Sequence, residues 1–312
     1  MTRLGIDIGG TTVKLGIVND TFEILEEQSI PTGADRSTEA VVADIIAAAR
    51  PLIAKYAPVT LGVGSPGSID PNAGVVLRAG NLPFRNVPLA ALLEEALGLP
   101  VSLENDANCA LIAEVTAGVC RGCKDALMIT IGTGIGGSIL IDGKIYYGHN
   151  LLAGELGHFV IHHGGRQCAC GMKGCFEQYA SATALVRATE TAIKEHPGSL
   201  LAEAGAGGVD GKTVFTALKQ GCPVADEVLS EYLSYLADGL NSLTFIFQPQ
   251  KIALAGGVAN AGDILTERLQ PLLGPRTNVA LSALKGQSGI LGAAMLPVFR
   301  SGLPDVAGDS SV

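Results

Sequence analysis

The sequence predicts an α/β protein built from two similar halves, and three observations lead to this prediction. Residues 4–19 and 126–145 each contain two strand-like segments joined by a turn of glycine and threonine. Apolar and polar residues alternate beside both turns, which is typical of a β-hairpin. Segments with helical periodicity alternate with short apolar strands in the region between them, which is typical of an α/β fold.

Helices and strands are expected to alternate between the two hairpins. We expect helices at Thr38–Tyr56, Leu89–Leu97 and Ala107 to about Ala117, and strands at Val59–Val63, which ends in the loop Ser65–Gly67, and at Val101–Glu104. Asn105 and Asp106 stand between the last strand and the last helix, and both residue types are good N-caps. An α/β protein also places catalytic carboxylates at such a junction. Asp106 is therefore either a helix cap or a catalytic group.

The second half adds further helices after a segment rich in cysteine. We expect helices at Ala182–Glu195, Lys212–Lys219, Ala225–Ile246 and Ser288–Phe299. A strand at Lys251–Ala255 is expected to be followed by Gly256–Val258 and then by a further helix that ends at about Leu273. The small residues of 203–210 indicate a surface loop. The polar tail Ser301–Val312 is expected to be disordered.

Composition excludes several classes of protein. The 312 residues are enough for two domains, and 47% of them are hydrophobic, which is sufficient for a large core. The net charge of −9 argues against nucleic acid or an anionic membrane as the main partner. An odd number of cysteines (7), no signal peptide before Leu4 and no long apolar run lead us to expect a reducing cytoplasm.

Four potential zinc ligands lie close together in the sequence. They are His158, Cys168, Cys170 and Cys175. Gly171 and Gly174 allow the backbone to turn back between the cysteines. Three cysteines and one histidine fill the coordination of a tetrahedral zinc, and a zinc with no open position is structural. The metal is therefore expected to shape a site and to do no chemistry.

Alternatives for these residues stay open on spacing alone. His162 and His163 are rival ligands, and the cysteines could be ordinary buried thiols beside a surface histidine. Three cysteines separated by small residues favour convergence on one ion. Cys120 and Cys123 could form a redox or metal pair, but they lie between a helix-like and a strand-like segment, and we interpret them as unremarkable thiols.

The turn of the second hairpin matches the pattern G-x-G-x-x-G through Gly132, Gly134 and Gly137. This turn is not interpreted as a dinucleotide-binding motif, because the glycines of such a motif lead into a helix and here a second strand follows. The exposed backbone N–H groups of such a turn can still hold phosphate oxygens. A plain hairpin turn that uses glycine for positive φ is the alternative.

Several motifs together resemble one known family. They are Asp7–Thr12 with Lys14, Glu104–Asn108, Ile131–Gly137, Gly154–His158 and the cysteine cluster. From Leu4 to about Phe299 the chain resembles the ROK family (repressors, open reading frames, kinases). The resemblance implies the duplicated ribonuclease-H-like fold of the hexokinase, actin and Hsp70 superfamily. It also implies a small lobe (1–119) and a large lobe (120–312), with the helix near 288–300 packing back on the small lobe.

The resemblance assigns a role to each motif in ATP-dependent phosphoryl transfer to a hexose. Asp106 is the expected general base, and Asp7 is expected near Mg²⁺. The residues expected to contact the phosphates or the adenosine of ATP are Gly9, Gly10, Thr11, Thr12, Lys14, Thr133, Gly134, Gly256 and Gly257. The zinc ligands are implied to be His158, Cys168, Cys170 and Cys175, so that His162 and His163 are no longer candidates.

The sugar ligands implied by the resemblance are Gly67, Asn81, Asn105, Asp106, Glu155, His158 and Glu177. Within the family the segment Gly174–Ser181 is most similar to bacterial glucokinases, so glucose is the expected substrate. Ala182 departs from that pattern, which has glycine there. Kinases for N-acetylmannosamine, N-acetylglucosamine, mannose or fructose are the alternatives.

A second class of protein is also possible within the family, the sugar-responsive repressors. Those carry a DNA-binding domain before the first hairpin, whereas three residues precede Leu4 here, so we expect no nucleic-acid partner. A sugar-binding protein without catalysis would require degraded phosphate turns or loss of Asp106, and both are intact. The resemblance to the family implies that the protein forms a homodimer.

Overall fold

The computed structural model of the protein describes residues 1–284 and 286–302. These residues form two compact units. The first contains Met1–Lys124, Ile139–Ala153 and the described residues from Ala283 onward, and the second contains Asp125–Ser138 and Gly154–Ser282. Most of the tail for which we expected disorder, residues 303–312, lies outside the described part of the chain.

The first unit is organised around a five-stranded sheet with the order β3-β2-β1-β4-β8. The strands are β1 (Thr2–Ile8), β2 (Thr12–Asn19), β3 (Ile24–Pro31), β4 (Leu61–Ser65) and β8 (Val101–Asn105). β1 and β2 form the expected antiparallel hairpin, while β4 runs parallel to both β1 and β8. A second, three-stranded sheet consists of β5 (Ser68–Asp70), β6 (Val75–Arg78) and β7 (Arg85–Val87).

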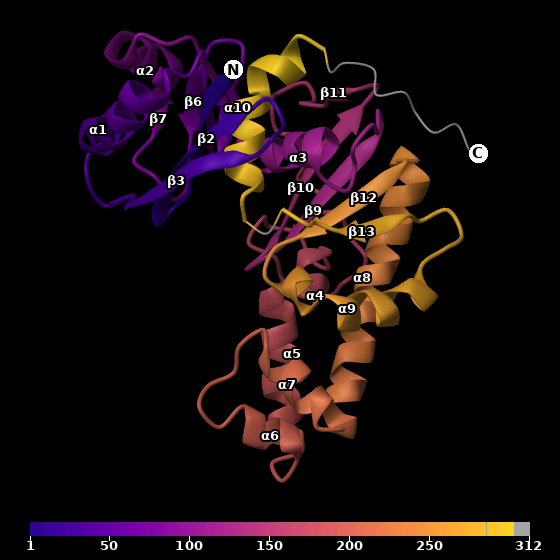
Figure 1. Ribbon diagram of the computed structural model, residues 1–312. Coiled ribbons are helices and arrows are strands. Elements are labelled where there is room, and N and C mark those ends of the chain that lie inside the picture. The colour runs from indigo at the N-terminus through magenta and orange to yellow at the C-terminus, as the bar shows by residue number, and fades with distance from the viewer. Residues whose placement is uncertain (285, 303–312) are drawn as a thin grey trace. The chain divides into compact units, whose positions relative to one another are not determined.

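Helices cover both faces of the five-stranded sheet (Figure 1). The helices are α1 (Thr38–Tyr56), α2 (Leu89–Leu97), α3 (Asp106–Ala117) and α10 (Ser288–Arg300). The buried side chains of Leu4 and Ile6 belong to the core that α1 and α2 close. The last helix of the chain, α10, packs with α3 against the other face, and their apolar residues form a separate small core that includes Ala113 and Ile290.

Glycines on adjacent strands make the close approach of α10 possible. Gly5 on β1 pairs in register with Gly16 on β2 and with Gly62 on β4, so the three form a row across the sheet. A Cβ atom at Gly5 would lie 2.2 Å from the carbonyl oxygen of Ile290, and one at Gly62 would lie 1.7 Å from that of Ala293. Because α10 occupies the space of these missing side chains, larger residues in the row would push the helix off the sheet.

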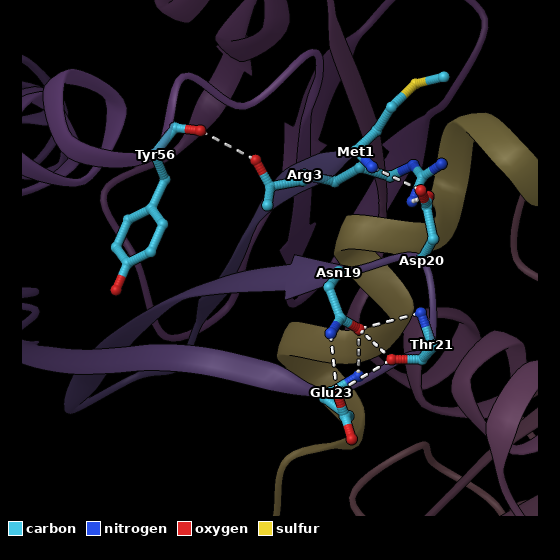
Figure 2. Close-up of polar contacts among 8 residues, drawn as sticks. Met1, Arg3, Asn19, Asp20, Thr21, Glu23 and Tyr56 are labelled. Atoms are coloured by element: carbon cyan, nitrogen blue, oxygen red, sulfur yellow. Dashed lines mark hydrogen bonds and ion pairs between the residues drawn. The ribbon is translucent and has the colours of Figure 1, made fainter.

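The β2–β3 turn is closed by its own polar side chains (Figure 2). The Asn19 side-chain oxygen accepts hydrogen bonds from the backbone N–H groups of Thr21 and Glu23, both at 2.9 Å. These side-chain hydrogen bonds take the place of the strand pairing, which stops at the turn. Asp20 contacts the N-terminal ammonium of Met1 and the Arg3 guanidinium, which tie the turn to the first strand.

The second five-stranded sheet has the order β11-β10-β9-β12-β13. Its strands are β9 (Ala126–Ile131), β10 (Ile135–Ile141), β11 (Lys144–Ile145), β12 (Lys251–Ala255) and β13 (Val279–Leu281). β12 runs parallel to β9 and to β13 within the second unit. The helices of this unit are α4 (Glu177–Ala180), α5 (Ala182–Glu195), α6 (Leu200–Ala204), α7 (Thr213–Lys219), α8 (Pro223–Phe247), α9 (Asp263–Leu269), and the 3₁₀ turns η1 (Val258–Ala261) and η2 (Gln270–Leu272).

Several expected elements differ from the structure in their bounds, among them β4 and the helix after β12. The strand predicted at Val59–Val63 begins two residues later, at Leu61, and extends to Ser65. The single helix expected after β12 is divided into η1, α9 and η2, because Gly262 takes a positive φ of 63° and Pro271 lies at the start of η2. Among the described residues, no helix combines the length and the apolar composition needed to cross a lipid bilayer.

Candidate functional site

In the first unit, the Gly9–Thr12 turn of the first hairpin is held at both ends. The Gly9 N–H donates to the Thr12 carbonyl at 2.9 Å, and the Thr32 hydroxyl donates to the Gly9 carbonyl at 2.7 Å. Gly10 and Thr11 are exposed at the tip of the turn. A Cβ atom on Gly10 would lie 3.5 Å from that of Asn81, so Asn81 lies beside the turn. The backbone of this turn can therefore donate to an anionic ligand.

Asp7 precedes this turn in β1, and burial is the main cause that raises the pKa of its carboxyl group to about 6. The negative charge of Asp106 raises the pKa further, while the Lys14 ammonium opposes the shift. Lys14 pairs with Asp7 in register on β2, and its Nζ donates to the Gly286 carbonyl at 3.1 Å. Two carboxyl groups that repel each other in a partly buried site are suited to a divalent cation.

Asp7 also lies against the beginning of α10. A Cβ atom at Gly289 would lie 2.3 Å from the Asp7 carboxyl group, so the first turn of α10 reaches this carboxylate because it has a glycine there. The sequence did not assign a role to Gly286 or Gly289, which are 279 and 282 positions after Asp7. Only the packing of α10 on the first sheet brings them to the site.

Asp106 begins α3, but it is not the residue that caps the helix. The Asn105 side-chain oxygen is the N-cap and accepts from the N–H groups of Ala107 (2.9 Å) and Asn108 (3.3 Å). Asp106 Oδ1 accepts from the Ala107 N–H at 2.9 Å, and burial raises the pKa of this carboxyl group against the effect of the backbone N–H groups. A buried carboxylate with a raised pKa is suited to accept a proton near neutral pH.

Asn105 connects the helix start to another predicted residue. Its side-chain Nδ2 donates to the Gly67 carbonyl at 3.1 Å. Gly67 has a φ of 100°, and a Cβ atom there would lie 2.2 Å from the Arg78 carbonyl oxygen, so only glycine fits. The structure therefore brings Gly67, Asn105 and Asp106 together in the first unit. Because the Asn105 oxygen is the helix cap, the Nδ2 hydrogen that does not bond Gly67 is the group it can offer to a ligand.

In the second unit, the turn with Thr133 and Gly134 lies on Glu177. A Cβ atom at Gly134 would lie 2.6 Å from Glu177 Oε2, and the Thr183 hydroxyl donates to the Thr133 carbonyl at 2.7 Å. The Ala182 N–H donates to the Gly132 carbonyl at 2.9 Å. Ala182, the departure from the glucokinase pattern, thus joins the start of α5 to this turn through its backbone.

The segment Gly154–His158 packs closely against β10. A Cβ atom at Gly157 would lie 2.4 Å from the Ile135 carbonyl oxygen, and one at Gly137 would lie 2.7 Å from the Leu156 side chain. This packing orients Glu155 and His158, and His158 Nε2 lies 3.8 Å from Glu155 Oε2. The Glu177 N–H donates to the Gly157 carbonyl at 2.9 Å, so Glu177, another predicted sugar ligand, lies beside the same segment.

The four predicted zinc ligands converge in the second unit. The ligand atoms of His158, Cys168, Cys170 and Cys175 all lie within 4.8 Å of one another. Cys168 Sγ lies 3.6 Å from His158 Nδ1, and Cys170 Sγ lies 3.5 Å from Cys175 Sγ. In a tetrahedral zinc site with bonds of about 2.0–2.3 Å, neighbouring ligand atoms are about 3.5–3.8 Å apart. The cluster therefore fits a closed, structural zinc.

The thiols of the cluster differ in how easily they ionise. Burial raises the pKa of Cys175 to about 12, and it also raises the pKa of Cys168. A hydrogen bond from the Met172 backbone N–H lowers the pKa of the exposed Cys170. Thiolates buried in this way need a positive charge nearby, which zinc supplies.

The rival histidines have other surroundings. The His162 ring stacks on Tyr179 with ring centroids 5.3 Å apart and an angle of 9° between the planes. His163 is exposed, and the metal cluster found among the described residues includes neither of them. Gly174, with a φ of 87°, brings the backbone back toward His162 so that Cys175 enters the cluster.

Gly256 and Gly257 follow β12 in the second unit. Gly256 has a φ of 94°, and a Cβ atom there would lie 2.4 Å from the Ile131 carbonyl oxygen, next to the Gly132 turn. A Cβ atom at Gly257 would meet nothing within 4 Å. The predicted adenosine turn and the second phosphate turn are therefore neighbours on adjacent strands.

Comparison with known proteins relates almost the whole chain to one family. A family model described as ROK family matches residues 3–298 of the chain. A glucokinase of Streptomyces coelicolor is 34% identical over 307 residues, which cover 94% of this chain and 96% of that protein. A putative xylose repressor of Caldicellulosiruptor sp. is 28% identical, and its match covers 95% of this chain and 77% of that protein. The crystal structure of a ROK family glucokinase from Streptomyces griseus, in complex with glucose and AMPPNP, matches with a TM-score of 0.78, 34% identity, and coverage of 97% of this chain and 100% of that one.

Proposed function

The chain belongs to the ROK family and has its two-lobed α/β fold of the actin and hexokinase kind, and we propose that it is a kinase that transfers the γ-phosphate of ATP to glucose. The observation that carries the proposal is the carboxyl group of Asp106, which is partly buried, has a raised pKa and begins α3 beside the charge of Asp7. The similarity to glucokinases over almost the whole chain supports the same reaction.

In the proposed reaction, Asp106 accepts the proton of the 6-hydroxyl group as this oxygen attacks the γ-phosphorus. Such a base must have enough basicity to take a proton, and a raised pKa increases the basicity of the carboxylate. Most of the rate in phosphoryl transfer comes from positioning and from neutralising charge on the phosphates. The first turn of α3 supplies the positioning, because Asn105 caps the helix and Asp106 follows it directly.

Two turns are proposed to hold the phosphates of ATP. Gly10 and Thr11 offer exposed backbone N–H groups in the first turn, and Thr133–Gly134 offers the corresponding groups in the second unit. Lys14 adds a cation near Asp7. When bound, Mg²⁺ neutralises phosphate charge, and Asp7 is the carboxylate that we propose to hold it. Gly256 and Gly257 are proposed to lie against the adenosine.

Zinc would be held by His158, Cys168, Cys170 and Cys175, and it would fix the segment between the two sugar-binding carboxylates. Glu177 Oε1 lies 3.1 Å from Cys168 Sγ and 3.7 Å from His158 Nδ1, next to the metal position. The Nε2 atom of His158 faces Glu155 and is free to bond a sugar hydroxyl. We propose that Glu155, His158 and Glu177, together with Asn81, Gly67, Asn105 and Asp106, bind the sugar hydroxyls.

The function is tested by ADP release from the purified, zinc-loaded protein with ATP, Mg²⁺ and a panel of hexoses and N-acetylhexosamines. We expect turnover with glucose, and its loss in Asp106→Asn. Asp35→Asn is the matched control, because Asp35 is exposed and lies outside the proposed site. No turnover with any sugar of the panel would reject the proposal.

A non-catalytic sugar sensor is the second candidate, favoured by the similarity to a putative xylose repressor. That function needs sugar binding without phosphoryl transfer. Tight binding of a sugar by calorimetry, with no ADP release in the same preparation, would support the sensor and reject the kinase.

A further inference from the structure

The carboxyl group of Glu104, which precedes the proposed base by two residues, is buried, with the residue 1% exposed. A buried carboxylate is stable only when donors and cations surround it. The groups that contact it are the Asn105 N–H (2.9 Å), the Asn108 side-chain amide (3.0 Å), the Tyr147 hydroxyl (2.6 Å) and the Arg300 guanidinium (3.5 Å). We call Glu104, Tyr147 and Arg300 the Glu104 network.

The two oxygens of Glu104 face different parts of the first unit. Oε1 accepts from Asn105 and Asn108, which belong to the cap and the first turn of α3. Oε2 contacts Tyr147, which follows β11, and Arg300, the last residue of α10. Glu104 therefore joins the helix start that carries Asp106 to two segments that are distant in the sequence.

Both outer members of the network are held in place. Burial and the charge of Glu104 raise the pKa of the Tyr147 phenol, so its hydroxyl stays protonated and donates. Arg300 also donates to the Leu103 carbonyl at 2.8 Å and thus contacts β8 just before Glu104. Helix α10 keeps Arg300 at this distance because it packs directly on α3, where a Cβ atom at Gly292 would lie 1.7 Å from the Cys109 carbonyl oxygen (Figure 1).

We propose that Tyr147 and Arg300 are positioning residues that act through Glu104 to hold the first turn of α3, and with it the carboxylate of Asp106, in its reactive orientation. The inference rests on the proposed function, because Asp106 is the base of that reaction. Neither Tyr147 nor Arg300 belongs to a motif of the chain, and neither contacts Asp106 directly. Their effect must pass through Glu104 and the cap residues.

The charges around the junction make this orientation sensitive. Burial is the main cause that raises the pKa of the Cys109 thiol. The carboxylates of Glu104, Asp7 and Asp106 raise it further, while the Arg300 cation lowers it, so these groups lie close together in one partly buried region. Three acids in such a region repel one another. Without the Tyr147 donor or the Arg300 cation, Glu104 has to move toward other donors, and the first turn of α3 moves with it.

The test compares Tyr147→Phe with Tyr146→Phe. Tyr147→Phe removes one hydroxyl and keeps the ring, while the neighbouring Tyr146 is 49% exposed and serves as the matched control. We expect kcat of Tyr147→Phe to fall about tenfold, because small misplacements of a catalytic group reduce rate strongly. The KM for ATP should stay within about twofold, since none of the proposed ATP-binding residues lies on α3.

A double-mutant cycle separates positioning from simple stabilisation. In the Asp106→Asn background there is no base left to position, so Tyr147→Phe should reduce the residual kcat less than about twofold. An equal loss in both backgrounds, or full turnover in Tyr147→Phe, would overturn the inference. If Tyr147→Phe is poorly folded, Arg300→Met replaces it, because it removes the cation beside Glu104 and keeps a long side chain; we expect a lower kcat with an unchanged KM for ATP.

Hydrogen exchange gives a readout that needs no turnover. Backbone amides of the peptide 104–112 should exchange faster in Tyr147→Phe than in the wild type, and at the wild-type rate in Tyr146→Phe. Unchanged exchange in Tyr147→Phe would overturn the inference even if the protein is an active kinase. Conversely, faster exchange in a protein that turns over no sugar would reject the proposed function while leaving the structural link between Tyr147 and α3 in place.

Discussion

His158 Nδ1 lies 3.6 Å from the sulfur of Cys168, at the separation of two ligands that share one tetrahedral zinc. The other ring nitrogen of His158 lies 3.8 Å from a Glu155 oxygen and points away from the cysteines. One imidazole therefore borders two environments, the cysteine cluster and the Glu155 carboxylate that we propose to bind the sugar. Zinc bound at this cluster would fix the ring orientation, so we expect zinc content to be coupled to sugar binding.

The first prediction concerns the metal. Cys170→Ser should reduce the zinc content measured by atomic emission, raise the KM for the sugar and lower kcat. The reason is that the segment from Glu155 to Glu177 is no longer held in place by the metal. Cys123→Ser is the control and should keep the metal, since Cys123 lies outside the cluster. Full activity of a zinc-free protein would contradict the structural role of the metal.

The second prediction concerns the base. Asp106→Asn keeps the size of the side chain but removes its ability to accept a proton, so kcat should fall by roughly 10²–10⁴. The fold should remain, because Asn105 is the residue that caps α3. Circular dichroism and thermal unfolding check the fold. A folded variant with normal turnover would reject the assignment of the base.

The third prediction uses the raised pKa of Asp7. The pKa of Asp7 is about 6 in the folded protein, against 3.8 for an ordinary aspartate, so the folded protein binds more protons than the unfolded chain between these values. Stability is therefore lost as pH rises through this window, and the full cost of about 3 kcal/mol remains above it. Asp7→Asn should raise the free energy of unfolding at pH 7.5 in Mg²⁺-free buffer, and by about half as much at pH 5.

Chemical denaturation at the two pH values measures this difference. Asp35→Asn is the control and should show little change at either pH, since Asp35 is exposed. The Asp7 variant should also lose turnover, because the proposed Mg²⁺ ligand is gone. An Asp7→Asn protein that is less stable than the wild type at pH 7.5 would show that the carboxylate has a stabilising partner that outweighs the cost of its burial.

The fourth prediction concerns the packing of α10. Gly62→Ala places a methyl group 1.7 Å from the Ala293 carbonyl oxygen, which the helix can relieve only by moving. We expect a loss of about 2–4 kcal/mol in the free energy of unfolding, as for other overpacked cores. Gly80→Ala is the control, because a Cβ atom there meets nothing within 4 Å. Equal stability of the two variants would contradict the close approach of α10.

Local pattern was sufficient for the hairpins and for several helices. The bounds of α1, Thr38–Tyr56, match the expected ones because Ser37 is a strong N-cap and the apolar period is regular. The small sheet of β5, β6 and β7 was not predicted, since strands of three or four residues are too short to show alternation. The edge strand β3 was also missed, because none of its side chains is fully buried and its sequence has few apolar residues.

Motifs located the zinc cluster and the residues around Asp106, while contacts between distant segments required the structure. The cysteines converge because they lie within eight residues of one another, so spacing carries the information. Spacing could not assign the helix cap to Asn105 instead of Asp106, because both residue types are good caps. Nor could it show that Tyr147 and Arg300 meet at Glu104, since 43 and 196 positions separate them from it.

The last prediction is the choice of sugar. Glu155, His158 and Glu177 form a polar group, and we propose that their carboxylates and imidazole bind the hydroxyl groups of the sugar. An acetamide on the sugar would add bulk and leave some of these groups unpaired, and such mismatches can cost several powers of ten. We therefore expect kcat/KM for glucose to exceed that for N-acetylglucosamine or N-acetylmannosamine by at least ~10² in the ADP-release assay. A higher kcat/KM for an N-acetylated hexosamine, mannose or fructose would overturn the preference for glucose and leave phosphoryl transfer to a hexose standing.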